Sequence, residues 1–294
     1  MRRPTQLGPI ALLVITLTVQ AGCERAAPYR GLTPIDGEWV ERLCESISKN
    51  CLEIDEINRS SDGRELRVVF RAETVVIAAS GTAQVYKKPR RVAWMNDAHE
   101  WIASSDDLKH GFYLLSESSR THAYGYPKFD SGGRFFAVTQ GDETVLYRVK
   151  PYRQEAVLPL NVASNVFVRP PFVFVIGPDR EVRRLRVYTY RDNGENVDFV
   201  SSRVIERPNG GSTSPFYVSD VAASGELFAI HDVSSAPVDA ESTVLIYEST
   251  ANQLKPTRKG TLPWATLFLS DDLHRRVRGK PKFTLAPSAS ASLN

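Results

Sequence analysis

A pattern that occurs twice constrains the fold of this chain more than any other feature. Its first copy spans 130–149 and reads as a turn (DSGGR), an apolar run (FFAV), a polar link and a closing run (VLYRV). The second copy spans 224–247 and has the same order, with the runs LFAI and VLIY. A small-residue turn between short strand-like runs indicates β-structure with hairpin connections. Because the unit recurs, we expect a repeat architecture.

Further strand-like runs fill the chain from residue 60 onward, and helical periodicity is scarce there. The additional runs lie at 66–70, 74–78, 83–86, 92–94, 101–103, 172–176 and 185–190. Equivalent positions recur at irregular intervals centred on the roughly 40 to 50 residues of a propeller blade. The sequence therefore predicts an all-β chain whose fold is a β-propeller of about five to six blades. A β-sandwich is the alternative, because short strands and turns would look much the same in it.

The segment Tyr126–Val138 resembles the blade sequence of TolB-type and WD-like propellers. In that family a Pro-x-Phe-Ser-Pro-Asp-Gly-Arg segment leads into an inner strand, and here Ser131 and Gly132 replace its second Pro and its Asp. The likeness covers one blade well and two others loosely. It implies a propeller fold, and it brings no catalytic residues because the motif encodes a turn and a buried strand. We expect the propeller-like domain, with its N-terminal helix, to span 37–285.

The start of the chain has the pattern of an export signal. Arg2 and Arg3 precede an apolar run at 10–19, which is shorter than the ~20 residues that a membrane-spanning helix needs. The following Ala21-Gly22-Cys23 resembles the lipobox of bacterial lipoproteins, although Gln20 stands where that family has an aliphatic residue. The resemblance implies a signal peptide over 1–22 and a Cys23 that carries lipid, palmitate included.

This lipid would attach the protein to a membrane of the bacterial cell envelope. Glu24 follows the cysteine, where an Asp in the lipoprotein family often marks retention at the inner membrane. The resemblance therefore implies the periplasmic face of the outer membrane. The alternative is ordinary secretion after cleavage at Ala21, with Cys23 left as a thiol.

The next segments are expected to form a tether and one short helix. Residues 23–36 are rich in Ala, Pro, Arg and Gly without apolar periodicity, so we assign them to a tether. Apolar residues then recur at helical spacing from Trp39 to Ile47, which predicts an amphipathic helix. The final residues, 286–294, are rich in Ser and Ala and are expected to be a disordered tail.

Cys44 and Cys51 are the two cysteines that remain once Cys23 is set aside. In an oxidising compartment, two cysteines favour one disulfide, and two independent thiols are the alternative. Seven residues of unbroken helix would separate their Cα atoms by about 10.5 Å. A disulfide needs ~4.4 to 6.8 Å. The helix must therefore end before Cys51 if the bond forms.

Composition excludes several classes of partner and chemistry. The chain has 37 basic and 34 acidic residues, and loss of Arg2 and Arg3 with the signal leaves 35 against 34. This balance provides no strong field for nucleic acid, so we expect no nucleic-acid partner. The five histidines show no metal-binding spacing, and the chain has neither a Gly-x-Ser-x-Gly elbow nor a phosphate-cradling loop. We therefore expect no metal site and no cofactor.

Function is only weakly specified by these patterns. The leading hypothesis is a lipid-anchored, non-catalytic binding or assembly module that contacts an envelope protein partner through its propeller loops. The alternative is a propeller hydrolase or lyase acting on a glycan or lactone. His231 and Asp232, which follow an inner-strand run, would then be channel or loop binding residues.

Two basic clusters also stand out, at 87–91 and 275–282. They could contact anionic lipid or an acidic partner. The alternative is that both are solvated loops.

Overall fold

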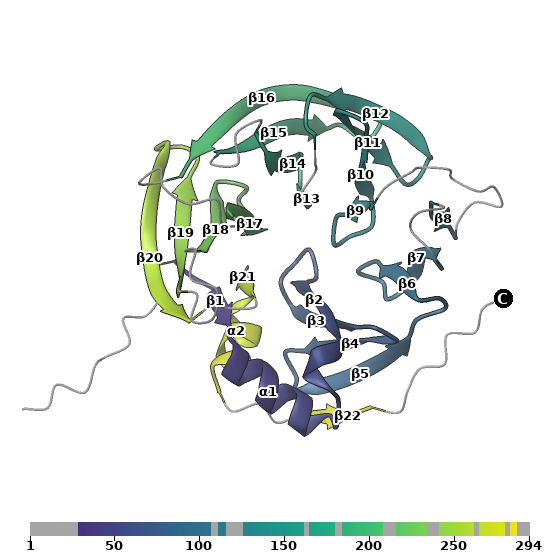
Figure 1. The fold of residues 1–294 in the computed structure, drawn as a ribbon, viewed down its shortest axis with the longest axis vertical. Coiled ribbons are helices and arrows are strands. Elements are labelled where there is room, and N and C mark those ends of the chain that lie inside the picture. The colour runs from purple at the N-terminus through teal and green to yellow at the C-terminus, as the bar shows by residue number, and fades with distance from the viewer. Residues whose placement is uncertain are drawn as a thin grey trace, which may run out of the picture.

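The computed structural model describes residues 29–106, 111–115, 126–161, 165–179, 184–207, 216–233, 241–261, 265–279 and 283–286. Within these ranges the chain forms a ring of mainly antiparallel sheets around a central axis (Figure 1). Five of the sheets are blades of a β-propeller, which confirms the predicted fold class and lies within the predicted blade number. The sandwich alternative is wrong, because the sheets are arranged radially instead of being stacked as one face-to-face pair.

Each blade is a meander whose strands follow one another from the axis outward. Blade 1 consists of β2 (Ile54–Arg59), β3 (Glu65–Phe70), β4 (Glu73–Ala78) and β5 (Thr82–Lys87), and blade 2 of β6 (Val92–Met95), β7 (Trp101–Ser105) and β8 (Tyr113–Leu114). Blade 3 consists of β9 (Lys128–Phe129), β10 (Phe135–Gln140), β11 (Glu143–Arg148) and β12 (Arg153–Leu158). Blade 4 consists of β13 (Asn165–Arg169), β14 (Phe172–Pro178), β15 (Arg184–Asp192) and β16 (Val197–Glu206). Blade 5 consists of β17 (Phe216–Val221), β18 (Leu227–Val233), β19 (Glu241–Glu248) and β20 (Gln253–Thr261).

The two ends of the fold close the ring together. Strand β1 (Leu32–Ile35) pairs with β21 (Ala265–Phe268), and this two-stranded closing sheet lies between blade 5 and blade 1 (Figure 1). The pairing corrects the expected tether over 23–36, because residues 32–35 are a strand of the fold. Leu32 and Ile35 are buried there, so apolar burial holds this strand in place.

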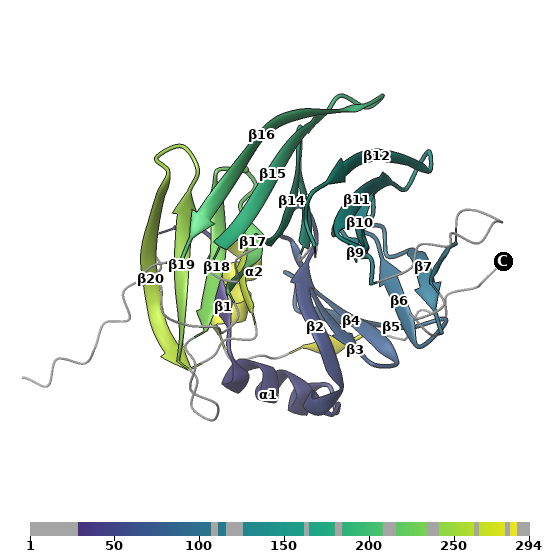
Figure 2. The same ribbon diagram turned by 45° about the horizontal axis from the view of Figure 1, so that its top comes forward.

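Two helices accompany the closing sheet. Asp36 caps the N-terminus of helix α1 (Gly37–Ser46), and its carboxylate accepts a hydrogen bond from Trp39 N at 2.9 Å. A 3₁₀ turn, η1 (Cys51–Glu53), follows the helix. In Figure 2, α1 lies at the rim of the ring beside the strands of blade 1. Helix α2 (Asp271–Arg278) buries Leu273 and Val277, so residues 275–278 of the second basic cluster are helical and not a loop.

Apolar packing between neighbouring blades forms the core. Separate clusters fill the spaces between blades 2 and 3, between blades 3 and 4, and between blades 4 and 5. Another cluster joins blade 1 to α1, α2 and β21. Strands such as β10 are therefore covered on both faces, which explains why Phe135 to Val138 form a continuous apolar run. This packing places the first strand of every blade next to the axis.

Candidate functional site

The turns that join the first and second strands of the blades all lie at one end of the ring, which we call the turn face. Three of them, from blades 1, 2 and 3, point toward the middle of the ring (Figure 1). In four blades the first turn residue donates its amide to the carbonyl of the residue that starts the second strand or precedes it. The N···O distances are 3.0 Å from Ser60 to Glu65, from Asn96 to Glu100 and from Asp130 to Phe135, and 2.8 Å from Ala222 to Leu227. The repeated sequence pattern thus encodes a repeated turn.

Asp130 shows how a side chain holds such a turn. Its Oδ1 accepts hydrogen bonds from the amides of Arg134 (2.8 Å) and Phe135 (2.6 Å), and its Oδ2 accepts one from Gly132 N (2.9 Å). Burial raises the pKa of this carboxyl above its usual value. Gly133 completes the turn at φ +68°, and a Cβ there would lie 2.8 Å from Ile102 Cδ1 in blade 2. Asp130 therefore has a structural role.

Hydrogen bonds join the turns of blades 1, 2 and 3 into one polar cluster, which we call the turn cluster. The amide of Ser61 donates to the Asp97 carboxylate (3.1 Å), and the hydroxyls of Ser61 and Ser131 lie 3.2 Å apart. Arg67 donates to Asp97 Oδ1 (2.5 Å) and to the Ser131 carbonyl (3.0 Å). The Arg67 side chain is buried, whereas Asp97 is partly exposed. The cluster therefore presents a surface whose polar groups are held in fixed positions.

A second chain of hydrogen bonds connects blade 1 to the turn of blade 2. The Tyr86 hydroxyl lies 2.9 Å from His99 Nδ1, and His99 Nε2 lies 2.8 Å from Glu65 Oε2. His99 has φ +62°, at the turn position where blades 1, 3 and 5 have glycine. Burial, followed by the charge of Glu65, raises the pKa of Tyr86.

The Tyr86 hydroxyl, the His99 imidazole and the Glu65 carboxylate are hydrogen-bonded one after another, as in the catalytic triads that activate a nucleophile. Tyr86, however, is buried and its pKa is raised, which is the opposite of activation. The chain of hydrogen bonds therefore orients His99 in a strained backbone position and leaves no accessible nucleophile.

A buried network of one aspartate and two arginines lies at the inner ends of three blades. Asp220 on β17 accepts hydrogen bonds from Arg59 Nε (2.5 Å) and Arg169 Nη2 (2.8 Å), and also from the amides of Val221 and Phe268 (2.8 Å each). The side chains of Asp220, Arg59 and Arg169 are only 2–4% exposed. Burial, and then the charge of Arg59, lower the pKa of Arg169 to about 10, so the Arg169 guanidinium is still charged at neutral pH.

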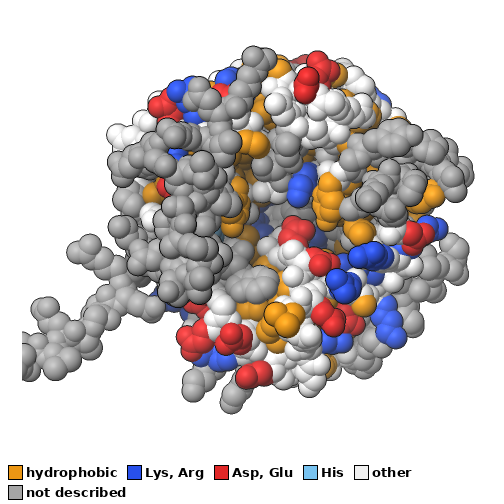
Figure 3. Space-filling model, in the orientation of Figure 1, with side chains coloured by type: hydrophobic (Ala, Val, Ile, Leu, Met, Phe, Trp, Pro, Cys, Tyr) orange, Lys and Arg blue, Asp and Glu red, His pale blue; other side chains and the backbone are white. Residues whose placement is uncertain are grey.

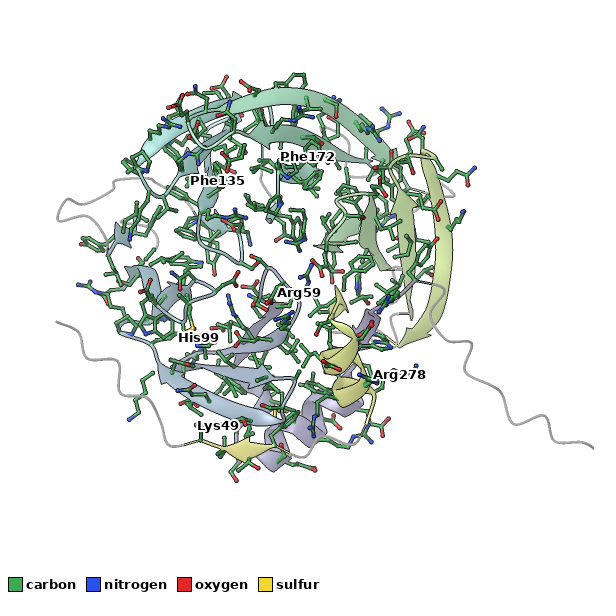
Figure 4. All side chains as sticks on the ribbon, turned by 180° about the vertical axis from the view of Figure 1, so that it is seen from behind. Lys49, Arg59, His99, Phe135, Phe172 and Arg278 are labelled. Carbon is green, nitrogen blue, oxygen red and sulfur yellow. A yellow bond between two sulfur atoms is a disulfide. The ribbon has the colours of Figure 1, made fainter. Side chains whose placement is uncertain are left out.

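This Arg-Asp-Arg network links blades 1, 4 and 5 to the closing sheet. In Figure 4, Arg59 lies near the middle of the ring, while His99 lies farther out, between blades 1 and 2. Figure 3 shows that the molecule is hollowed at its centre, with basic and acidic side chains around the hollow. The Arg-Asp-Arg network thus brings buried charges together near the axis, at the inner ends of blades 1, 4 and 5.

The cysteines named by the sequence analysis fall into two groups. Cys44 and Cys51 form the expected disulfide, with Cα atoms 5.7 Å apart, and α1 ends before Cys51 as the geometry required. Cys23, together with the expected signal peptide, lies outside the described residues.

The structure does not bring His231 and Asp232 together. They are neighbours on β18, so their side chains point to opposite faces of the blade. His231 is fully buried and stacks on Tyr217, with ring centroids 5.3 Å apart and an interplanar angle of 15°. Neither of its ring nitrogens has a hydrogen-bond partner among the described residues, and burial lowers its pKa to about 4.

Asp232 forms an ion pair with Arg207 instead, at 2.7 Å. Burial raises its pKa, although Arg207 acts in the opposite direction. In this arrangement the two side chains do not form an exposed acid and base pair, and their assignment as binding residues stays a prediction.

The sequence analysis missed the turn cluster and the Arg-Asp-Arg network. One signal was available, since Arg169 and Asp220 each stand within or next to an apolar strand run, where a charge requires a partner. The sequence does not indicate which charges pair in the fold, because Arg59 and Asp220 are 161 residues apart in the chain.

Metal-binding clusters and membrane-spanning helices are both absent from the described part of the chain. No group of three or more His, Cys, Asp or Glu residues there could hold a metal ion. None of the helices in those ranges has the length and apolar character needed to span a membrane.

Comparison with known proteins shows likeness at the level of the fold. No protein-family model and no curated protein matches the chain. Among solved structures it is similar to Hsv2 of Kluyveromyces lactis, with a TM-score of 0.45, 11% identity, and coverage of 71% of this chain and 63% of that one. It is also similar to a candidate TolB of Agrobacterium tumefaciens, with a TM-score of 0.46, 12% identity, and coverage of 74% and 84%.

A third similar structure is TolB of Acinetobacter baumannii, with a TM-score of 0.37, 13% identity, and coverage of 70% of this chain and 52% of that one. The chain thus spans less than two thirds of the length of Hsv2 and of this TolB. At these identities the likeness concerns the propeller fold alone.

Proposed function

We propose that this protein is a non-catalytic binding or assembly module of the bacterial cell envelope, and that a protein partner docks on its turn face. The observation that carries this proposal is the turn cluster, in which side chains of three blades hold one another in place. Ser61 and Asp97 are partly exposed within it and are fixed by bonds to neighbouring blades. A surface that is ordered before binding loses little conformational freedom when a partner docks.

The rim of this surface carries charges of both signs. The exposed residues on the turns of blades 1, 2, 3 and 5 include Asp62, Arg64, Glu100, Arg134 and Glu226. Such a rim favours a partner with complementary charges, because rim charges steer association and determine the orientation of docking. It does not favour a polyanion such as nucleic acid, for which a field of one sign is needed.

The proposed location is the periplasmic face of the outer membrane, with lipid on Cys23. This part of the proposal depends on the export signal and on the resemblance of Ala21-Gly22-Cys23 to a lipobox. Mass spectrometry of the mature N-terminal peptide tests it, since an acylated Cys23 is expected in the native protein and its loss in Cys23→Ser. An unmodified N-terminus would refute the anchor and leave the docking proposal standing.

Site-specific photo-crosslinking in intact host cells tests the docking surface. A photo-reactive residue at the exposed Ala98 on the turn face should capture one protein in stoichiometric yield, and the same residue at the exposed Ser202 on β16 should not. Charge reversal at Arg64 and Arg134 should abolish this capture. Charge reversal at Arg71, an exposed residue on the turn that joins β3 to β4, is the matched control. Equal capture at both probe positions would contradict the proposal.

A further inference from the structure

Blade 1 differs from the other blades because it carries a fifth strand. Residues near the C-terminus form β22 (Thr284–Leu285), which pairs in parallel with the outer strand β5, Thr284 beside Thr82 and Leu285 beside Ala83. The amide of Thr284 donates to Gly81 O (3.1 Å), and that of Ala286 donates to Ala83 O (2.9 Å). Figure 1 shows β22 between the end of α1 and β5. The chain itself therefore adds a strand to a sheet edge, a mode that proteins use to bind extended peptides.

One aromatic side chain anchors this added strand. Phe283 packs edge-on against Trp39 of α1, with ring centroids 6.3 Å apart and an interplanar angle of 70°. Trp39 is only 4% exposed, and its indole N–H finds no acceptor among the described residues. The phenyl ring of Phe283 offers no acceptor oxygen to it. The side chains of Thr284 and Leu285 are exposed, so the strand is held mainly by its backbone and by Phe283.

The rest of the β5 edge is longer than the segment that covers it. Strand β5 continues to Lys87, but β22 pairs only with Thr82 and Ala83. Within the described ranges no other strand pairs with this edge. Because the pairing is parallel, a longer strand at this position would run toward Lys87.

Basic residues follow at the end of this edge. Lys88 and Arg90 have acidic partners in Asp55 and Asp106. Lys87 and Arg91 are exposed, and neither forms an ion pair with an acidic side chain of the described ranges. The chain's own continuation, 287–294, has the sequence PSASASLN and contains no acidic residue that could meet them.

We propose that the β5 edge beside α1 is a docking site for an extended peptide of a partner protein, which residues 283–286 occupy within the same chain. The peptide would place an aromatic residue at the position of Phe283 and acidic residues beside Lys87. Since Thr284 lies beside Thr82, the residue beside Lys87 is the sixth after the aromatic one. The site is separate from the turn face, so it adds a second contact to the proposed function and does not depend on it.

Two fluorescent peptides test the proposal by fluorescence anisotropy with the full mature chain. One has the chain's own sequence 283–294, and the other carries Ala289→Asp and Ser290→Asp, which places acid beside Lys87. Phe283→Ala in the protein weakens the internal occupant, so the acidic peptide should bind about tenfold more tightly to this variant than to the wild type. If folded Phe283→Ala binds neither peptide up to about 1 mM, the proposal is overturned.

A reversible covalent lock provides the matched control. Thr82 and Thr284 are exposed and in register, so Thr82→Cys with Thr284→Cys can form a disulfide that retains the internal strand. The oxidised protein should lose peptide binding, and mild reduction should restore it, whereas Thr82→Cys alone should behave as the wild type under both conditions. Unchanged peptide binding by the oxidised double variant would refute displacement of β22.

Charge reversal distinguishes the occupants. Lys87→Glu with Arg91→Glu should remove the preference for the acidic peptide while binding of the neutral peptide is unchanged. If the wild type binds the neutral peptide as tightly as the acidic one, the occupant is the C-terminal segment of a second copy of this chain. That result overturns the assignment to an acidic partner.

Discussion

Removal of the charge of Asp220 should destabilise the ring more than any other single charge neutralisation among the described residues. Asp220→Asn has nearly the same shape, but it leaves the buried guanidinium groups of Arg59 and Arg169 without their counter-charge. Breaking a buried ion pair from one side costs about 3–5 kcal/mol. This is a large share of the roughly 5–15 kcal/mol by which a native protein is stable. Asp272, whose ion pair with Arg275 is exposed, provides the control, and Asp272→Asn should cause little change.

Urea unfolding followed by circular dichroism measures these differences from the transition midpoints at constant slope. Arg169→Met should partly rescue Asp220→Asn because it removes one of the two stranded charges, with a coupling of about 1–3 kcal/mol in the double-mutant cycle. If Asp220→Asn is no less stable than Asp272→Asn, or if the double variant shows no coupling, the reasoning about buried charge is wrong.

Two further perturbations test other parts of the fold. Burial lowers the pKa of His231 from 6.5 to about 4, so between these pH values the unfolded chain binds a proton that the native protein does not. The free energy of unfolding should therefore be greatest above pH 6.5 and should fall by about 3 kcal/mol as the pH falls to 4. His231→Phe should remove this part of the pH dependence in unfolding measured by circular dichroism, and an unchanged slope would contradict the assignment. Replacement of Cys44 and Cys51 by alanine should lower the free energy of unfolding by about 2 kcal/mol, the value expected for a short closed loop. A midpoint equal to that of the native protein would show that the crosslink does not constrain the unfolded chain.

The sequence predicted the elements of the propeller well where their patterns are local. The turn at 130–134 and the strand at 135–138 are in place, because Asp130 and Gly133 satisfy requirements within a few residues of themselves. The pair of Cys44 and Cys51 was accessible for the same reason, since a helix of known rise limits the distance between them.

Elements that pair over long distances were missed. Strand β1 was assigned to a tether because Leu32 to Ile35 is short, and its partner β21 lies more than 200 residues further along the chain. Helix α2 was not recognised, because its basic residues outweigh the two apolar ones, Leu273 and Val277, that it buries. In both cases the decisive apolar contacts come from other parts of the ring.

The sequence by itself determined the repeating unit of this protein, since turn chemistry and strand alternation act between residues that are close in the chain. Only the tertiary structure decided how the ring closes and where its polar groups meet. Asp220 gains two arginine partners, and β5 gains the C-terminal strand β22, only after the blades have been arranged around one axis. The cost of burying a charge or exposing an edge can be read from sequence, but the group that compensates for it is selected by the fold.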